Sequence, residues 1–377
     1  MKKILLVFML VFFACSVYAD DEYGNVEIHG FLSQGFIQSD KYNFWTADTE
    51  DGTFEFNEMG LNFSTDLTDN LRFGVQLFAK DLGDIGNDAV VIDWAYADYR
   101  FRNWLGIRIG KVKRPTGLYN QSRDIDAART SIFPPTSIYN DKFRAAALSS
   151  KGAGLYGLLP ARFEYQLTYG AMDIPPDSPA IAQATNAMSE TAEKTRVENS
   201  TNFQLLWNTP IQGLLIGGTI LDYDFDVITP SPVLRFFGYH YIYSIEYINK
   251  NINISAEYKS GKDKFEYNGT EITDNSPEEY FAQASYRFTD FFELGTSYSV
   301  TYPDKDDRDG DKQIAKGNPA AQGWLRDITI STRVDLNDFW IVKLEAHGMD
   351  GLYQVEYTDA NPSKRWFLYA AKTTFTF

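Results

Sequence analysis

The sequence predicts an all-β fold: a 16-stranded antiparallel transmembrane β-barrel with short turns at one end and long loops at the other. Segments of about ten residues alternate apolar and polar side chains along the whole chain. Aromatic residues make up 16% of the 377 residues, as expected of a barrel with aromatic girdles. After the N-terminal region no apolar run reaches the roughly 18 residues of a spanning helix. Strands cross a bilayer only in a closed sheet that pairs every backbone group.

Residues 1–19 have the features of a secretory signal peptide. A basic start is followed by a short apolar run and a small-residue cleavage site ending at Ala19. Residues 20–377 are therefore expected to form a single exported barrel domain. This mature region contains no cysteine, because Cys15 lies in the leader, so thiol chemistry and cysteine-based metal sites are excluded. Lipidation of Cys15 is an alternative that the residues before it match poorly.

The predicted strands pair as hairpins in chain order. The clearest hairpin joins residues 56–66 to 71–80 across a four-residue turn, with apolar side chains on one face of both strands. Seven short turns alternate with eight longer loops, which is typical of bacterial outer-membrane barrels with periplasmic turns and extracellular loops. The expected strands are 26–38, 56–66, 71–80, 92–101, 105–111, 146–156, 163–170, 200–207, 214–221, 237–247, 252–258, 280–288, 293–302, 328–336, 341–347 and 365–377.

A basic stretch interrupts this acidic chain. The formal net charge is −16, yet residues 99–147 include ten basic and three acidic residues. A solvated charged loop is the ordinary explanation of such a run. However, Pro115, Pro134 and Pro135 would end strand pairing and redirect the chain. We therefore expect a pore-constricting loop around residues 112–145.

Basic side chains in a confined pore favour anions, because charge in a narrow lumen is poorly screened. Arg100 and Arg108 lie on the predicted polar faces of their strands, and the other basic residues follow in the loop. Asp124 and Asp126 either lie across from this basic wall and create a transverse field, or pair with Arg123 and Arg129. The candidate pore-lining residues are Arg100, Arg108, Lys111, Lys113, Arg114, Arg123, Asp124, Asp126, Arg129, Lys142 and Arg144.

The sequence offers no catalytic or metal-binding motif. His29, His240 and His347 are the only histidines and lie on well-separated strands. Residues 304–311 are rich in aspartate, but alignment with a calcium loop puts lysine at both the first and the last ligand position. A solvated acidic loop is expected there, with weak divalent-cation bridging to lipopolysaccharide as an alternative. We expect no enzyme activity, metal, cofactor or nucleic-acid partner.

Two segments carry a family resemblance. The end of the chain, Phe367-Leu-Tyr-Ala-Ala-Lys-Thr-Thr-Phe-Thr-Phe377, resembles the C-terminal assembly signal of Gram-negative outer-membrane proteins. Residues 93–101, 104–118 and 122–124, with the run Gly110-Lys-Val-Lys-Arg-Pro-Thr-Gly117, resemble porins related to the phosphate-selective (polyphosphate) family. The resemblance implies a 16-stranded, commonly trimeric porin whose third loop folds inward and narrows the pore.

These features favour a passive outer-membrane porin for small hydrophilic solutes, with ion transport that prefers anions through a basic constriction. Outer-membrane lipid, lipopolysaccharide and further copies of the chain in a homotrimer are the expected partners. One alternative is a non-conducting barrel that acts as adhesin or receptor through the loops around 173–199 and 302–323. Another is a soluble periplasmic β-protein.

Overall fold

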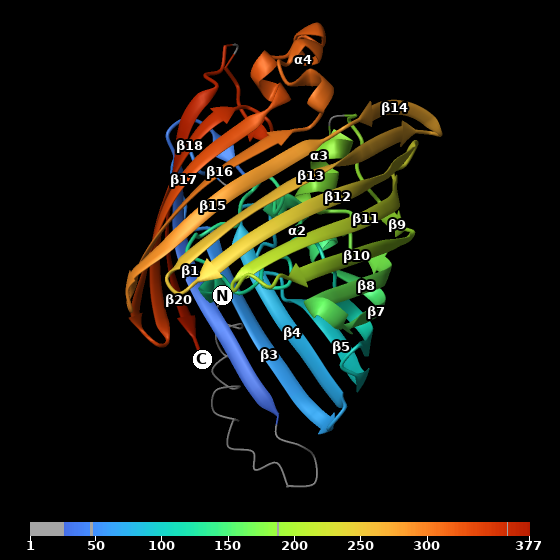
Figure 1. Cartoon of the computed structure of the whole chain (residues 1–377). Coiled ribbons are helices and arrows are strands. Elements are labelled where there is room, and N and C mark those ends of the chain that lie inside the picture. The colour runs from blue at the N-terminus through green and yellow to red at the C-terminus, as the bar shows by residue number, and fades with distance from the viewer. Residues whose placement is uncertain (1–25, 46–47, 187, 360) are drawn as a thin grey trace, which may run out of the picture.

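The computed structural model describes residues 26–377 apart from 46–47, 187 and 360 (Figure 1). Eighteen strands form one antiparallel sheet, in which β9 and β14 are short extensions, so sixteen strands make up the barrel. The sheet closes because β1 pairs with β20 along one edge and with β3 along the other. The predicted 16-stranded antiparallel barrel is confirmed. The predicted signal peptide lies outside the described residues.

Barrel strands that are neighbours in the chain are neighbours in the sheet. They are β1 (Glu27–Ser39), β3 (Phe56–Thr68), β4 (Leu71–Leu82), β5 (Val91–Arg102), β6 (Leu105–Lys113), β7 (Ser149–Leu159), β8 (Phe163–Met172), β10 (Asn199–Asn208), β11 (Leu214–Ile228), β12 (Val233–Asn249), β13 (Ile252–Tyr267), β15 (Glu278–Thr289), β16 (Phe292–Tyr302), β17 (Leu325–Asn337), β18 (Trp340–Gly351) and β20 (Arg365–Thr376).

The remaining elements are short and lie in the connections. Four strands occupy the loop end: β2 (Asn43–Phe44), β9 (Lys194–Val197), β14 (Thr270–Asn275) and β19 (Val355–Glu356). The helices are η1 (Asp126–Ala128), η2 (Asp141–Phe143), α2 (Arg144–Leu148), η3 (Pro160–Arg162), α3 (Pro179–Asn186), η4 (Lys305–Asp307), α4 (Asp311–Ala315) and η5 (Ala320–Gly323). No helix in these described ranges combines the length and the apolar character needed to cross a membrane.

The barrel has its charged side chains inside and its apolar side chains outside. On β18 the side chains of Lys343, Glu345 and His347 are buried, whereas Leu344 between them is 56% exposed. Because successive side chains of a strand point to opposite faces, this pattern assigns the charges to the lumen and the leucine to the outer surface. An apolar outer surface is the surface that a barrel presents to lipid.

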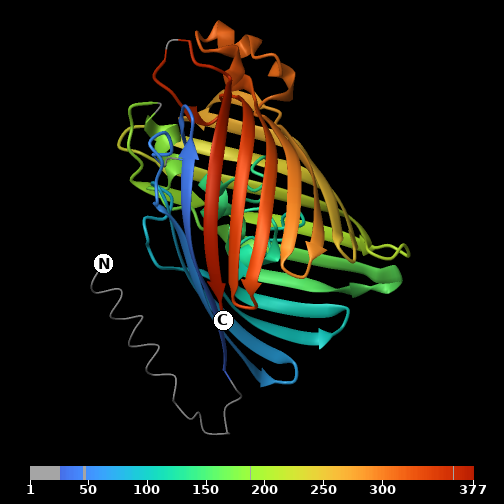
Figure 2. The ribbon, with the colours of Figure 1, turned by 90° about the vertical axis from the view of Figure 1, so that its left-hand side faces the viewer.

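The two ends of the barrel differ (Figure 2). Seven short turns lie at one end together with the C-terminus, and the long connections with α3 and α4 lie at the other. We call these the turn end and the loop end. Figures 1 and 2 also show the connection between β6 and β7, coloured teal, within the outline of the barrel.

Four expected boundaries at the loop end were wrong. Strand β11 continues to Ile228 and β12 begins at Val233, where a longer loop was expected over 222–236, because the alternating pattern of aromatic and β-branched residues continues through this region. Strand β13 similarly continues to Tyr267 and turns into β14. Residues 146–148 belong to helix α2 instead of β7, since Arg144-Ala-Ala-Ala-Leu148 favours a helix.

The terminal phenylalanine helps to close the barrel. The backbone N–H groups of Gly30 and Phe377 each donate to the other's carbonyl oxygen, at 3.1 and 3.0 Å. A Cβ on Gly30 would lie 2.5 Å from the Phe377 ring. Glycine at position 30 thus leaves room for the Phe377 ring beside the β1–β20 seam.

An apolar core fills part of the lumen near the loop end. The rings of Phe56 on β3 and Phe133 in the β6–β7 connection stack at 5.1 Å, and Trp45 lies 4.3 Å from Phe133. All three side chains are buried. Apolar packing inside the barrel therefore holds the β6–β7 connection against the wall.

Candidate solute path in the lumen

Residues 114–148, which we call the lumen segment, cross the barrel interior. The backbone N–H groups of Ile132 and Phe133 donate to Glu345 on β18, at 2.7 and 3.2 Å. The N–H of Leu118 donates to Glu257 on β13, at 2.9 Å. Strands β13 and β18 are separated by three barrel strands, β15, β16 and β17. The segment is therefore bound to well-separated parts of the wall, and it occupies space that an open pore would leave to water.

A glycine allows the segment to turn close to the wall. Gly117 has a φ of +57°, in the left-handed region that favours glycine. A Cβ there would lie 2.3 Å from Tyr139 Oη and 2.7 Å from Glu257 Oε1. The Tyr139 hydroxyl donates to Glu257 and accepts from the N–H of Tyr119. The close approach at Gly117 thus positions a hydrogen-bonded cluster that joins the segment to β13.

Most of the candidate basic residues have carboxylate partners. The ion-pair distances are 2.9 Å for Arg108–Asp98, 2.7 Å for Lys111–Asp173, 2.7 Å for Lys113–Asp124, 3.2 Å for Arg123–Asp141, 3.4 Å for Arg129–Asp126 and 2.7 Å for Arg144–Asp93. Asp93, Asp98 and Asp173 lie on or just beyond strands of the wall. The local excess of positive charge in the sequence is therefore largely neutralised in the folded barrel.

The acidic candidates also pair instead of facing a basic wall. Asp126 lies 3.1 Å from Lys343, 3.3 Å from Lys372 and 3.4 Å from Arg129. Burial raises the pKa of Asp126, but the two lysines and Arg129 lower it by more, so the pKa lies below its ordinary value. Asp124 pairs with Lys113. Of the two arrangements that the sequence left open, ion pairing is the one found, with partners that include wall lysines.

Two candidates are placed away from the constricted region. Lys111 lies beside Ala95 and Lys151 in the sheet and shares the outer face of β6 with Ile109, which is 64% exposed. Side-chain alternation along β6 points Lys111 to the outer face, away from the lumen segment. Arg100 is exposed near the end of β5, at the turn end of the barrel.

Arg114 and Lys142 differ from the other cations of the lumen segment. Within the described residues neither has a carboxylate within 4.0 Å. The Arg114 guanidinium donates to Asn202 Oδ1 at 2.8 and 3.0 Å and to the Ala146 carbonyl, and burial lowers its pKa to about 10. Burial also lowers the pKa of Lys142, partly offset by the charge of Glu356. The segment therefore holds two buried cations without a neutralising contact.

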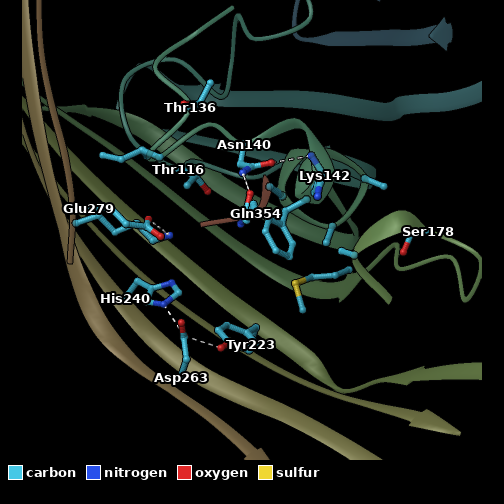
Figure 3. A pocket seen from close by; sticks show the side chains of 18 of the residues that line it. Thr116, Thr136, Asn140, Lys142, Ser178, Tyr223, His240, Asp263, Glu279 and Gln354 are labelled. Carbon is cyan, nitrogen blue, oxygen red and sulfur yellow. Dashed lines mark hydrogen bonds and ion pairs between the residues drawn. The ribbon is translucent and has the colours of Figure 1, made fainter. Parts of the chain in front are cut away.

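The lumen segment lies between two cavities. The larger, about 320 Å³, is lined by the loop-end halves of β11, β12 and β13 together with residues of the segment and of the 172–184 region (Figure 3). The smaller, about 110 Å³, is lined by the segment and by β13, β15, β16 and β17 near their turn ends. We call them the loop-end cavity and the turn-end cavity. Each is far smaller than the interior of an open 16-stranded barrel.

Several lining residues of the loop-end cavity were not among the sequence candidates. Tyr223, His240 and Asp263 form a hydrogen-bonded group in its wall, with His240 Nε2 2.7 Å and Tyr223 Oη 2.6 Å from Asp263 Oδ1. Lys259 pairs with Glu279 at 2.6 Å. Tyr223, Lys259 and Asp263 lie on strand extensions that the sequence analysis ended too early, whereas His240 lies within the predicted strand 237–247. Continued alternation through residues 223–263 was the signal that could have placed them in the lumen.

The aspartate-rich loop holds no group suited to a metal ion. Among the residues whose placement is described, no three His, Cys, Asp or Glu side chains gather as a possible metal site. Asp304 accepts from Lys312 Nζ at 2.5 Å and from backbone N–H groups. Asp304 and Asp307 are buried, so the expectation of a fully solvated acidic loop was wrong for both.

Comparisons with known proteins identify the architecture. No protein-family model and no curated protein matches the chain. The outer membrane channel DcaP of Acinetobacter baumannii is similar in structure, with a TM-score of 0.64, 10% identity, and coverage of 96% of this chain and 99% of that one. OmpT of Vibrio cholerae has a TM-score of 0.60, 13% identity, and coverage of 96% and 99%. The anion-selective porin from Comamonas acidovorans has a TM-score of 0.56, 12% identity, and coverage of 94% and 100%. The chain has the β-barrel fold of outer-membrane porins.

Proposed function

We propose that the protein is a passive outer-membrane porin that admits small solutes with a preference for anions. The observation that carries the proposal is the lumen segment, which is bound across the interior between two cavities. A segment in this position sets a size limit on solutes, and passage requires no catalytic residue. We propose that the constriction predicted around residues 112–145 is the part of the path that selects solutes.

We assign the anion preference to a few residues of the basic stretch, not to all of them. Six of the candidate cations are ion-paired, so their fields are largely cancelled at the distances of a passing solute. Arg114 and Lys142 lie in the lining of the loop-end cavity without such partners. Buried charge acts more strongly than surface charge because it is poorly screened. We assign the anion preference to these two residues, with Arg100 contributing at the turn end.

The proposal also includes a homotrimer that contacts outer-membrane lipid and lipopolysaccharide. A homotrimer is supported by the similarity to the Vibrio cholerae OmpT, of which one solved form is described as a trimer. Contact with outer-membrane lipid and lipopolysaccharide is supported by the exposed apolar side chains that recur around the outer face.

Planar-bilayer recording tests the proposal. Purified folded protein should form ion-conducting channels, and in a salt gradient the reversal potential should indicate anion preference. Clear cation selectivity would contradict the assigned role of Arg114 and Lys142. Absence of conductance from folded protein would contradict a porin.

A second candidate, a non-conducting barrel that acts as adhesin or receptor, is favoured by one observation. The lumen segment is hydrogen-bonded to the wall and packed by Phe56 and Trp45, so little space remains around it. In that case the loops around 173–199 and 302–323 would carry the activity. The same bilayer recording distinguishes the two candidates.

A further inference from the structure

The loop-end cavity has two chemically different sides. One side is apolar and comes from the 172–184 region and from the strand extensions, with Met172, Ile174, Ile181, Phe225 and Phe236 in its lining. These five side chains belong to one apolar cluster together with Val227 and Leu234. An apolar wall of this kind favours an apolar group of a ligand over water.

The other side is cationic and comes from the lumen segment. Arg114, Arg123 and Lys142 all line the cavity. Arg123 is ion-paired with Asp141 through Nη2 only, and its buried Nε has no hydrogen-bond acceptor in the described part of the chain. Its side chain is 3% exposed. Buried donors are nearly always satisfied in folded proteins, so an unsatisfied guanidinium N–H in a cavity wall indicates a place for an acceptor from a ligand or water.

The carboxylates in the lining do not cancel this charge. Asp263 is engaged by His240 and Tyr223 (Figure 3). Glu279 is paired with Lys259. Both pairs lie on the wall strands β11 to β15, whereas Arg114 and Lys142 extend from the lumen segment. The positive charge that remains therefore belongs to one side of the cavity.

We propose that the loop-end cavity is a binding site for an organic monoanion in which one carboxylate is attached to an apolar body. The carboxylate contacts Arg114, Arg123 and Lys142, and the body lies against Met172, Ile181 and Phe225. A volume of about 320 Å³ is within the range of small-molecule sites. A second charge on the ligand would have to lie against the apolar wall and lose its hydration, so dicarboxylates and inorganic phosphate fit less well. This inference rests on the proposed porin function and names the solute class that the path accepts.

The first test compares four anions as blockers of single-channel current, added from the loop end of the barrel. Benzoate has the proposed chemistry, acetate lacks the apolar body, and succinate and phosphate carry more charge. Benzoate should reduce the current at concentrations at least about tenfold lower than acetate, since each tenfold step corresponds to about 1.4 kcal/mol and burial of an aromatic ring exceeds that. Equal block by benzoate and acetate, or stronger block by succinate or phosphate, would overturn the proposal while leaving the porin function intact.

Two variants with matched controls locate the site. Lys142→Gln removes a lining cation, and Lys316→Gln removes an exposed lysine after α4 in the outer loops. Ala184→Glu adds a carboxylate to the lining from α3, and Gln183→Glu adds one at an exposed position of the same helix. The lining variants should weaken benzoate block by about tenfold or more, the scale of one lost charge-assisted hydrogen bond, and the controls should not. Equal effects in a lining variant and its control would contradict the site.

Binding can be measured even if no current is found. Calorimetric titration of benzoate into the folded wild-type protein and the Ala184→Glu variant reports the site without conduction. If no current is found but benzoate binds to the wild type and not to the variant, the site is supported although the porin function is not. Absence of binding to both would overturn the inference.

Discussion

Arg144 of the lumen segment and Asp93 of β5 form a bidentate ion pair, with Nη1–Oδ1 and Nη2–Oδ2 distances of 2.9 and 2.7 Å. Both side chains are buried, and the Arg144 guanidinium also lies 3.9 Å from the centre of the Phe78 ring. This pair anchors α2, the last turn of the segment before the chain enters β7. The position of the segment therefore depends on a contact between one residue of the segment and one residue of the wall, which are 51 positions apart in the chain.

Arg144→Ala should loosen the lumen segment and destabilise the barrel. Removal of one partner leaves Asp93 buried without a counter-ion, which costs about 3–5 kcal/mol. We expect a lower thermal unfolding temperature in detergent and a larger single-channel conductance. Arg144→Lys should recover part of the stability, because lysine restores the charge but not the bidentate geometry. An unfolding temperature and a conductance equal to those of the wild type would contradict an anchoring role.

Gly117→Ala should disturb the attachment of the segment to β13. The new Cβ would meet Tyr139 Oη and Glu257, and the left-handed conformation itself disfavours alanine by about 1–2 kcal/mol. Gly317→Ala is a matched control, since Gly317 also has a positive φ, of +83°, but a Cβ there meets nothing within 4 Å. Thermal unfolding should show a larger loss for Gly117→Ala than for Gly317→Ala. Equal losses would mean that the close approach to Tyr139 contributes nothing.

Acid should detach the lumen segment from the wall only at a pH below the pKa of an ordinary aspartate. The pKa values of Asp124, Asp126 and Asp141 are all lowered in the folded protein, since buried basic neighbours outweigh the opposing effect of burial. A lowered folded-state pKa contributes stability above the unfolded pKa of about 3.9, and this stability is lost as the pH falls through the folded value. Unfolding temperature should therefore decline below about pH 4. Asp126→Asn should lower the stability at neutral pH and show a smaller decline in acid, and an identical acid profile for variant and wild type would contradict the assignment.

The barrel could be predicted from local sequence patterns, but the ion pairs inside its lumen could not. Alternation of side chains along each strand, such as Lys343, Leu344 and Glu345 on β18, identifies both faces from neighbouring residues alone. The same rule, applied through Ile109, also places Lys111 outside. The pairing of lumen charges depends on contacts such as Lys372 with Asp126, 246 residues apart, which no local pattern contains. A count of charges within one stretch therefore overstated how basic the constriction is.

The end of β11 was predicted too early, because its acidic residues outweighed the alternation that continues past Leu221. The extension of β11 to Ile228 carries Asp222, Asp224 and Asp226, and acidic residues ordinarily indicate a loop. Pairing with β12 nevertheless continues, with Asp224 bound to Arg235 at 2.7 Å. Cross-strand partners of this kind become visible only when the register is known.

Charge reversal at Lys142 tests the central claim most directly. The measurement is the reversal potential across a bilayer in a salt gradient for the wild type and for Lys142→Glu. The wild type should prefer anions, and Lys142→Glu should shift the reversal potential toward cation preference, because the change lies in the lining of the path with no carboxylate close enough to have neutralised the lysine. A wild-type channel that prefers cations, or a reversal potential that Lys142→Glu leaves unchanged, would contradict the account.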